Sequence, residues 1–467
     1  MRRIASLAIV LVSSVLLAGS LPSISASSLT AARPVAARAV SEHTATFNEP
    51  APWGTKLQQD AILRDVDEAI DAAQRPTKNF PDPTITIATH LLDHTTSVNA
   101  LINACKRGIG IRVVLDGDIV NRNSRRLISA LNGDNVRDTD GDGRPDTEPR
   151  TGRCGTKKHH AKGARGRTTT APTLMSRREA RLSLDTPTGA SKTWGRDKSY
   201  VKRCAGSCRN AGTGGNMHSK FYLFSRTGSA RNVVMVSSSN LNRGGAQSGW
   251  NDLYVMRDRP KTYDAYLRLH RAMTRELRAE QQREEIIDGP FTNRFFPMRN
   301  ASKKTDPTLL DLKKIKCTSD LGRTEIYISM FYWKGARGNY LADQILTLAR
   351  SGCKVSIIYG APSRQLAERL RTAAANNLIS LYDSRWDMNE DGYNEVRTHA
   401  KYVIVKGAYR GNRSAYVVMT GSQNWVAGSL NLGDETTTNV ELKSAYVSYK
   451  KSWDNIRVHS RELPYAG

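Results

Sequence analysis

Two short segments of the chain place a histidine and a lysine one residue apart at the head of an apolar run. They are MHSKFYLFS, with His218 and Lys220, and THAKYVIVK, with His399 and Lys401. In an extended chain residues i and i+2 point to the same side, so each pair presents an imidazole and an ammonium group together. One such histidine is more often a hydrogen-bonded structural group than a catalyst, but two copies with the same lysine offset favour chemistry.

Each pair is followed by a Ser/Asn turn and then by an acidic residue. The first copy has Asn240 and Asp252, and the second has Ser422, Asn424 and Glu435. If the copies converge, two lysines and two asparagines supply the positive charge and donors that suit the oxygens of a phosphodiester. One imidazole can attack phosphorus to form a phosphohistidine while the other protonates the leaving oxygen. We expect Asp252 and Glu435 to lie behind the two rings and to set their tautomers and pKa values.

The order of segments along the chain predicts two copies of one α/β unit. Each copy has a β-rich run, a helical stretch and then a Val/Ile-rich run: 84–92 and 105–118 in the first copy, 324–333 and 352–362 in the second. This order predicts a βαβ unit. The amphipathic pattern of residues 262–285 predicts a long helix that closes the first copy, with residues 288–297 as the link to the second.

These segments resemble the HxK(x)4D…GSxN motifs of the phospholipase D superfamily, in its form with two motifs in a single chain. The resemblance extends from about residue 47 to about residue 448 and is strongest at the two histidine segments and the two Ser/Asn turns. It implies two duplicated α/β-sandwich lobes related by pseudo-twofold symmetry, with one active site at their interface and no cofactor or metal required for catalysis. The site residues that it assigns are His218, Lys220, Asn240, His399, Lys401, Ser422 and Asn424.

The motifs depart from the family pattern at several positions. Ser225 and Lys406 stand in place of the two motif aspartates, and Ser237 stands in place of the first glycine of GSxN, with Ser238 at the serine position. In such enzymes the aspartate is usually thought to support structure rather than chemistry, so we keep the catalytic assignment. The family pattern also favours the N-terminal histidine as nucleophile, here His218, with His399 as the acid.

The N-terminus predicts export. Arg2 and Arg3 precede a mostly apolar run and then small residues, which indicates a secretory signal peptide over 1–26, the alternative being a membrane anchor. We expect a leader or disordered segment over 27–46, a first lobe over 47–287 with a basic insertion at about 137–215, and a second lobe over 288–467. The mature protein is expected to be secreted, extracellular and monomeric.

The net charge of +26 favours polyanionic partners. We expect a phospholipid or membrane-surface substrate, whose headgroup is hydrolysed or transferred. The alternative is a secreted metal-independent nuclease, and a third hypothesis is an anion-binding protein without activity. The two complete His/Lys pairs argue against the third.

Cysteine and acidic loops suggest further structural features. Six cysteines in an exported chain predict three disulfides, with Cys317 bound to Cys353 and the other four paired in an order left open, while CAGSC (204–208) also has a spacing that zinc could use. Two loops have the spacing of calcium sites but lack the glutamate at position twelve, so a structural calcium or an ion-free turn is expected. Their candidate ligands are Asp138, Asp140, Asp142 and Asp146 in the first loop, and Asp387, Asn389, Asp391 and Glu395 in the second.

Overall fold

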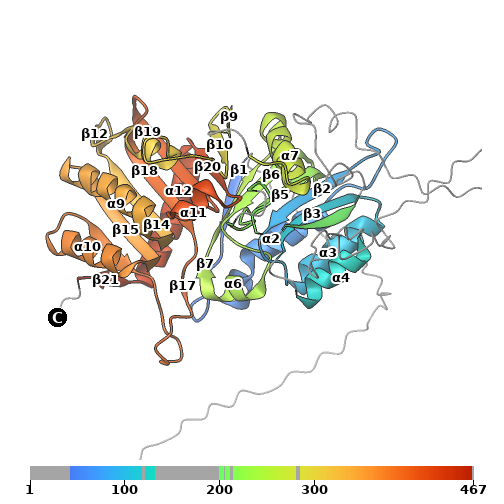
Figure 1. Cartoon of the computed structure of the whole chain (residues 1–467), viewed down its shortest axis with the longest axis horizontal. Helices are drawn as coiled ribbons and strands as arrows, with labels where there is room; N and C mark the ends of the chain where they lie inside the picture. The colour runs from blue at the N-terminus through green and yellow to red at the C-terminus, as the bar shows by residue number, and fades with distance from the viewer. Residues whose placement is uncertain are drawn as a thin grey trace, which may run out of the picture. The chain divides into compact units, whose positions relative to one another are not determined.

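The computed structural model describes residues 43–117, 121–131, 199–204, 206–210, 214–279 and 284–464. They form two α/β lobes, each built on one large sheet, as the duplicated sequence predicted (Figure 1). Among these residues, none of the helices is long and apolar enough to cross a membrane.

The first lobe has a sheet of seven strands in the order β1-β8-β6-β5-β2-β3-β4. The strands are β1 (His43–Phe47), β2 (Thr84–Thr89), β3 (Gly110–Asp116), β4 (Tyr200–Cys204), β5 (Phe221–Thr227), β6 (Ala230–Ser237) and β8 (Asp252–Met256). The helices are α1 (Lys56–Gln59), α2 (Ala61–Asp71), α3 (Thr95–Lys106), α4 (Arg122–Ala130), α6 (Arg243–Ser248) and α7 (Pro260–Thr274). The parallel pair β2–β3 with α3 between them is the predicted βαβ unit.

The second lobe repeats this arrangement around the path β21-β16-β15-β14-β18-β19-β20-β10-β9. The strands are β9 (Glu284–Asp288), β10 (Phe291–Phe295), β14 (Glu325–Trp333), β15 (Lys354–Pro362), β16 (Ser380–Asp383), β18 (Lys401–Tyr409), β19 (Asn412–Gly421), β20 (Thr436–Val440) and β21 (Arg461–Leu463). Three two-residue strands, β11 (Ile315–Lys316), β12 (Thr318–Ser319) and β13 (Gly322–Arg323), lie before β14. The helices are α8 (Pro307–Leu312), α9 (Gly335–Arg350), α10 (Arg364–Ala375), α11 (Ala427–Asn431) and α12 (Lys443–Val458).

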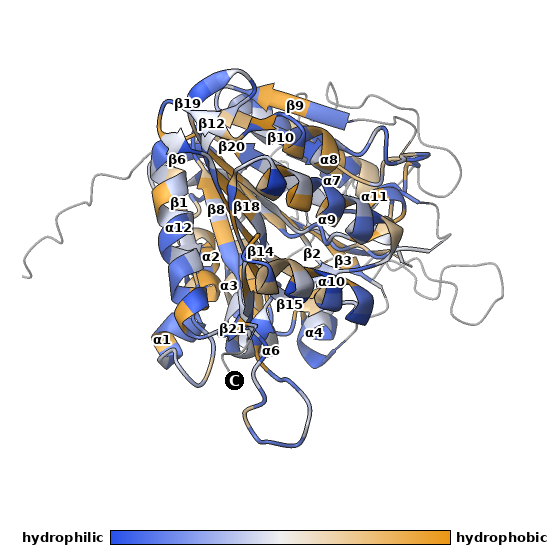
Figure 2. Cartoon of the chain, turned by 90° about the vertical axis from the view of Figure 1, so that its left-hand side faces the viewer, coloured by the Kyte–Doolittle hydropathy of each residue, from blue (hydrophilic) through white to orange (hydrophobic). Residues whose placement is uncertain are grey.

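One hydrophobic cluster joins the two lobes. Side chains of α7, such as Tyr266 and Met273, and of α12, such as Tyr449 and Trp453, belong to the same buried cluster as one face of each sheet. The opposite faces of the sheets are covered by α2 and α3 in the first lobe and by α9 and α10 in the second. Figure 2 shows the same division, with hydrophobic colour on the strands and hydrophilic colour on exposed helix surfaces. Both faces of each sheet are therefore buried, which explains the continuous apolar runs of the strands.

Several predicted boundaries differ from the structure. The helix predicted over 262–285 ends at Thr274, and β9 and β10 then form a hairpin whose strands join the second sheet through β20. The predicted link at 288–297 is therefore largely a strand of the second lobe. Because Asp288 pairs with Phe291, the central residues of the hairpin turn are Gly289 and Pro290, and Gly289 has the positive φ (59°) that the first central position of a type II′ turn needs.

Two further boundaries of the first lobe also shift. Residues 43–46, assigned to the leader, lie in β1, which pairs with β8. The insertion predicted at 137–215 contains β4, a strand parallel to β3 in the same way that β16 is parallel to β15. That part of the insertion thus belongs to the repeated fold, and most of its basic stretch lies outside the described residues.

Candidate active site

The two motif histidines are held at the lobe interface by equivalent backbone contacts. The N–H of His218 donates to the carbonyl oxygen of Asp434 at 3.0 Å, and the N–H of His399 donates to that of Trp250 at 2.9 Å. The second contact belongs to a small parallel sheet of β7 (Gly249–Trp250) and β17 (Arg397–Thr398). Each histidine is therefore bonded to the opposite lobe, which is the convergence that the duplicated motifs predicted.

Both motif lysines are buried beside their histidines. Nζ of Lys220 donates to the carbonyl oxygen of His218 at 2.5 Å, and Nζ of Lys401 donates to that of His399. Burial lowers the pKa of Lys220 to about 7, although Glu435 and Asp116 oppose the change. Burial and the neighbouring charge of Lys220 lower the pKa of Lys401 well below its usual value. An anion bound between the two ammonium groups would be strongly favoured.

The two imidazole rings have different partners. Nδ1 of His218 lies 2.9 Å from Oε2 of the buried Glu435, as predicted. Nδ1 of His399 lies 2.8 Å from Oδ1 of Asn251, so an amide occupies the place where a carboxylate was expected. Because an amide oxygen only accepts hydrogen bonds, it fixes the proton of His399 on Nδ1 and leaves Nε2 toward the substrate.

Asp252 is the partner of neither ring, and its predicted place behind one of the motif histidines is wrong. Its Oδ2 accepts hydrogen bonds from the hydroxyl groups of Thr420 and Tyr449, the latter at 2.8 Å. Successive residues of an extended chain point to opposite sides, so Asn251 faces the ring while Asp252 faces the core between the lobes. Burial raises the pKa of Asp252 despite these hydrogen bonds and the charge of Lys401.

The electrostatics of the two rings follow from their partners. Burial lowers the pKa of His218 to about 4, and the charge of Glu435 limits this decrease. Burial lowers the pKa of His399 well below its usual value, and both lysines add to the effect. Although burial favours the neutral acid form of Glu435, His218 and Lys220 outweigh it and hold its pKa below the usual value. The unliganded site therefore contains two neutral imidazoles and an ionised carboxylate.

The Ser/Asn turns hold the strands in register. Ser422 Oγ accepts a hydrogen bond from the N–H of Thr436 at 3.0 Å, and Ser238 Oγ accepts one from the N–H of Asp252 at the same distance. Ser422 thus acts on the backbone that carries Glu435. Asn424 Oδ1 accepts a weak hydrogen bond at 3.3 Å from the N–H of Tyr332.

A cavity of about 120 Å³ opens beside His399. Most of its lining residues have polar side chains, and the aromatic ring of Phe331 forms an apolar part of the wall, with the Arg397 guanidinium 5.4 Å from the ring centre. The lining side chains include Asn240, Asn242, Ser248, Asn251, Phe331, Glu395, Arg397 and His399. Oδ1 of Asn240 is buried and has no hydrogen-bond partner among the residues that the structure describes, so this predicted site residue is available to a ligand.

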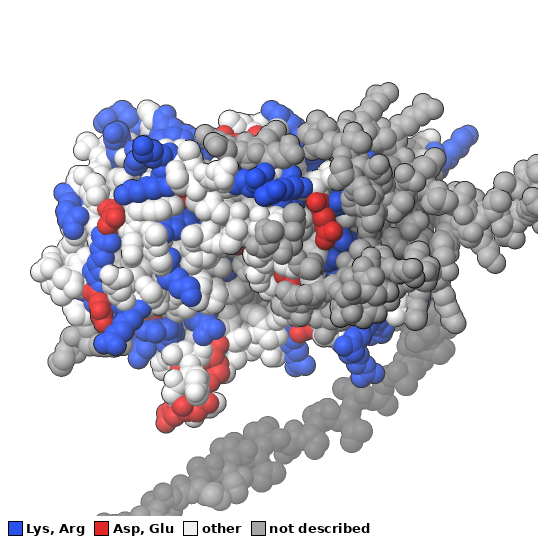
Figure 3. Space-filling view, in the orientation of Figure 1, with Lys and Arg blue, Asp and Glu red and all other residues white. Residues whose placement is uncertain are grey.

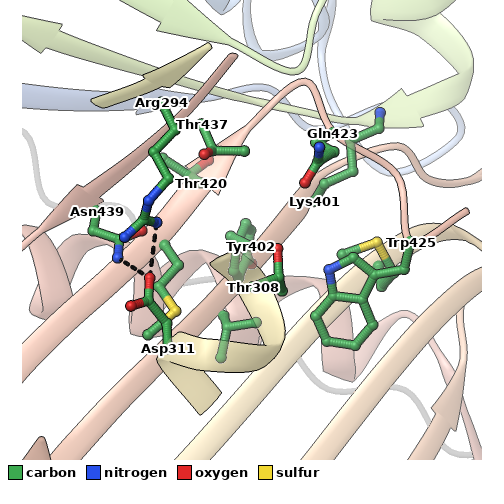
Figure 4. Close-up of a pocket in the computed structure, with 13 residues that line it drawn as sticks. Arg294, Thr308, Asp311, Lys401, Tyr402, Thr420, Gln423, Trp425, Thr437 and Asn439 are labelled. Atoms are coloured by element: carbon green, nitrogen blue, oxygen red, sulfur yellow. Dashed lines mark hydrogen bonds and ion pairs between the residues drawn. The ribbon is translucent and has the colours of Figure 1, made fainter. Parts of the chain in front are cut away.

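A smaller cavity of about 40 Å³ lies behind Lys401 in the second lobe. Figure 4 shows Arg294, Asp311 and Asn439 on one side of it and Lys401 with Gln423 on the other. Asp311 accepts hydrogen bonds from Arg294 and Asn439 at 2.8 and 2.7 Å. This buried network joins α8 to β10 and β20.

Each motif histidine has a ring beside it that the sequence patterns did not indicate. The ring of His90, directly after β2, is 5.2 Å from the ring of His218, and Nδ1 of His90 is 3.3 Å from Oδ2 of Asp116. The corresponding neighbour of His399 is Phe331, at 4.8 Å. Aligning TITIATHLL with TEIYISMFYW would have placed His90 opposite Phe331 and drawn attention to both positions.

The residues that stand in place of the two motif aspartates make contacts with neighbouring strands. Ser225 Oγ accepts a hydrogen bond from the N–H of Thr84 at 2.8 Å and donates to its carbonyl oxygen at 3.1 Å, which ties β5 to β2. Lys406 lies 3.7 Å from Glu325 on the neighbouring strand. Both positions thus support the sheets and lie on the strands after the histidines.

The disulfides confirm one pairing and resolve another. Cys317 is bonded to Cys353, as predicted. Cys204 is bonded to Cys208, so these two cysteines are not ligands of a zinc ion. The turn closed by the Cys204–Cys208 disulfide contacts the opposite lobe. There Asp434 accepts hydrogen bonds from the N–H groups of Cys208 and Arg209 and from the Ser207 hydroxyl. Cys154 lies outside the described residues, so the remaining pairing stays a prediction.

The acidic loop before His399 gathers three of its predicted calcium ligands. Oxygens of Asp387, Asp391 and Glu395 lie within 4.8 Å of one another, while Asn389 donates to Asp391. The loop between β16 and β17 projects at the lower edge of Figure 1 and shows acidic side chains in Figure 3. The ligands expected in the first loop, Asp138, Asp140, Asp142 and Asp146, lie outside the described residues, and calcium binding stays a prediction.

Comparisons with known proteins place the chain in a family. Solved structures that resemble it include a polyphosphate kinase from Porphyromonas gingivalis (TM-score 0.47, 13% identity, covering 88% of this chain and 46% of that one). A second is a phosphatidylserine synthase from Haemophilus influenzae Rd KW20 (TM-score 0.49, 12% identity, covering 87% of this chain and 86% of that one). A third is Nuc, a phospholipase D family member from Salmonella typhimurium (TM-score 0.27, 16% identity, covering 38% of this chain and 98% of that one). The chain thus spans less than half the length of the polyphosphate kinase, and no curated protein matches its sequence.

The family comparison covers both lobes. The family model described as "Cardiolipin synthase, PLD-like domain" matches residues 69–274 and 317–456, well over half of the chain. The first stretch contains His218 and Lys220, and the second contains His399 and Lys401. This chain belongs to the phospholipase D superfamily.

Proposed function

We propose that the protein is a secreted phosphodiesterase of the phospholipase D type, which hydrolyses or transfers a phospholipid headgroup through a phosphohistidine on His218. The observation that carries the proposal is the pairing of His218 with Glu435 and of His399 with Asn251 at one interface, beside two buried lysines. This is the set of groups that an in-line displacement at phosphorus requires.

In the first step Nε2 of His218 attacks phosphorus, the P–N bond forms and the bond from phosphorus to the leaving oxygen breaks. Glu435 accepts the Nδ1–H of His218 and stabilises the positive charge that the ring gains. His399, protonated when the anionic substrate binds, gives the proton on Nε2 to the leaving alcohol. The two ammonium groups bind the non-bridging oxygens, whose negative charge grows in the transition state.

In the second step neutral His399 takes a proton from water or an alcohol, which attacks phosphorus and breaks the P–N bond. Asn251 suits this role because a neutral amide stabilises the imidazolium less than a carboxylate would. A less stabilised imidazolium is a stronger acid, and it returns its proton more readily. The different partners of the two rings thus favour His218 as nucleophile and His399 as acid and base.

The matching family is described by a lipid synthase, which supports a phospholipid substrate. The amide-rich cavity beside His399 fits a small polar alcohol as the leaving or incoming group. The alternative substrate is nucleic acid, and the observation in its favour is the net charge of +26. Figure 3 shows Lys and Arg side chains of the described residues distributed over the visible face.

A side-by-side assay of the mature protein tests the proposal. It uses phosphatidylcholine and phosphatidylglycerol vesicles, single- and double-stranded DNA and RNA, each with and without EDTA, and His218→Ala and His399→Ala as controls. Headgroup release that persists in EDTA and is lost in both variants is the expected result. Cleavage of nucleic acid with intact vesicles would establish the alternative, and equal activity of parent and variants would refute the mechanism.

A further inference from the structure

The two lobes place different rings at equivalent positions beside their histidines. Counted along the registers of β2 with β5 and of β14 with β18, His90 corresponds to Phe331. Both rings lie against the motif histidine of their own lobe, at 5.2 and 4.8 Å between ring centres. One half of the site therefore has an additional imidazole where the other has a hydrocarbon ring.

The contacts of His90 fix which nitrogen faces the site. Nδ1 lies 3.1 Å from the carbonyl oxygen of Met217 and 3.3 Å from Oδ2 of Asp116. A carbonyl oxygen only accepts, so Nδ1 carries a proton. Nε2 has no protein partner in the part of the chain that the structure describes, and the side chain is 16% exposed. The free nitrogen is thus available to a ligand.

Asp116 ties His90 to the motif that carries His218. Its side chain is 1% exposed, and Oδ2 also accepts a hydrogen bond from the N–H of Met217 at 3.1 Å. One buried carboxylate thus holds both the imidazole of His90 and the residue before His218. A carboxylate that binds Nδ1 fixes the orientation of the ring, and a proton on Nε2 would then be donated to an anion.

The geometry of displacement indicates what Nε2 of His90 would meet. In a near-attack arrangement phosphorus lies about 3–3.5 Å from the attacking nitrogen. The leaving oxygen is on the far side of phosphorus, and the other oxygens surround the line of attack. A ring beside His218 therefore reaches one of those other oxygens rather than the leaving group.

We propose that His90 is a third imidazole of the active site, oriented by Asp116, whose Nε2–H donates to a non-bridging oxygen of the phosphodiester beside His218. The proposal rests on the proposed phosphodiesterase function and adds a residue that the HxK motifs do not include. His90 makes and breaks no covalent bond; it strengthens its hydrogen bond as negative charge develops on that oxygen. Phe331 cannot do this, so the phosphate is held from the side of the first lobe.

Variants of His90 separate this role from a structural one. His90→Asn keeps a donor near the position of Nδ1 and removes Nε2, whereas His90→Gln places an amide near Nε2. With bis(p-nitrophenyl) phosphate as substrate, we expect kcat to fall about 10- to 100-fold in His90→Asn and in His90→Phe, and to recover in part in His90→Gln. His94→Asn is the matched control, because His94 has the same 16% exposure and its ring contacts Asp67 and Ser97 instead of a motif histidine.

Asp116 should act through His90. Asp116→Asn is expected to lower kcat in the parent protein and to have little further effect in the His90→Phe variant. Parental kcat in His90→Asn, or full additivity of Asp116→Asn with His90→Phe, would overturn the proposal. Thermal unfolding of each variant shows whether a loss of activity reflects a loss of folding instead.

A binding measurement on the parent protein tests the contact without turnover. On titration with inorganic phosphate, the imidazole NMR signals of His90 are expected to shift together with those of His218, while those of His94 stay in place. Signals of His218 that shift while those of His90 do not would overturn the inference and leave the proposed function intact. If the parent lacks activity on every phosphodiester, the proposed function fails, and this titration still decides whether His90 contacts phosphate.

Discussion

The two halves of the active site share a backbone and differ in their side chains. Each motif histidine donates its N–H to the opposite lobe, and each Ser/Asn turn clamps the strand that follows it. Yet His218 has a carboxylate partner, Glu435, and a histidine neighbour, whereas His399 has an amide partner, Asn251, and a phenylalanine neighbour. The two lobes thus share a scaffold, and they give the two imidazoles different partners.

The backbone of the second lobe leaves no room for a counterpart of Asp116. The position equivalent to Asp116 in the second lobe is Gly360, by the registers of β2 with β3 and of β14 with β15. A Cβ at Gly360 would lie only 2.5 Å from the carbonyl oxygen of Thr398. The backbone that leads to His399 thus occupies the space that a carboxylate would need, so the second lobe cannot copy the His90–Asp116 pair without rearrangement.

The largest expected effect separates the two histidines by the step that each one serves. p-Nitrophenolate leaves without a proton, so His399→Ala should still form the phosphoenzyme from bis(p-nitrophenyl) phosphate. It should release a burst of a single equivalent and then turn over about 10²–10⁴-fold more slowly than the parent. His218→Ala should show no burst.

Stopped-flow release of p-nitrophenol, with trapping of the phosphohistidine in base, checks this expectation. The double variant, which should show neither burst nor turnover, is the control. A burst in His218→Ala and none in His399→Ala would reverse the assignment of the two lobes.

The partners of the rings should matter unequally. Glu435→Gln removes the charge that stabilises the phosphohistidine, and we expect kcat to fall about 100-fold. Asn251→Ala removes only a neutral acceptor, and a decrease of about 10-fold is expected. Steady-state kinetics with a common substrate measure both values. Equal losses would mean that the two partners do the same work and that the comparison between the lobes has no chemical meaning.

The sequence predicted the paired residues better than their partners. The repeated HxK spacing predicted both His/Lys pairs and their convergence, because i and i+2 positions depend only on extended backbone. It could not distinguish Asn251 from Asp252, since a shift of one residue reverses the side of a strand and the acidic residue looked more suited to a histidine. His90 was missed because it lies outside the motif, and its contact with His218 depends on strand order.

Asp252 is expected to matter for stability more than for chemistry. Asp252→Ala leaves the buried hydroxyl groups of Thr420 and Tyr449 without their shared acceptor, which should lower the free energy of unfolding by about 1–3 kcal/mol. Because Asp252 is not in contact with His399, kcat should fall less than in Glu435→Gln. Denaturant unfolding and kinetics on the same preparation measure the two effects. An activity loss that matches Glu435→Gln without a loss of stability would restore Asp252 to the catalytic set.

The smallest effect comes from making the two halves alike. Asn251→Asp would place a carboxylate behind His399 and raise the pKa of its ring, because the negative charge stabilises the imidazolium. Since His399 acts as the acid, its protonated form would persist to higher pH, and the alkaline limb of the pH–rate profile should move up by about one unit. The ring would also become a weaker acid, so kcat at the optimum should fall by only a few-fold for an alkyl leaving group and less for p-nitrophenolate.

Asn251→Ser, which adds no charge, is the control that should leave the alkaline limb in place. A limb that moves down in Asn251→Asp, or moves equally in both variants, would show that the amide does not set the acidity of His399, and the asymmetry of the two lobes would then have to arise from His90 and Phe331 instead.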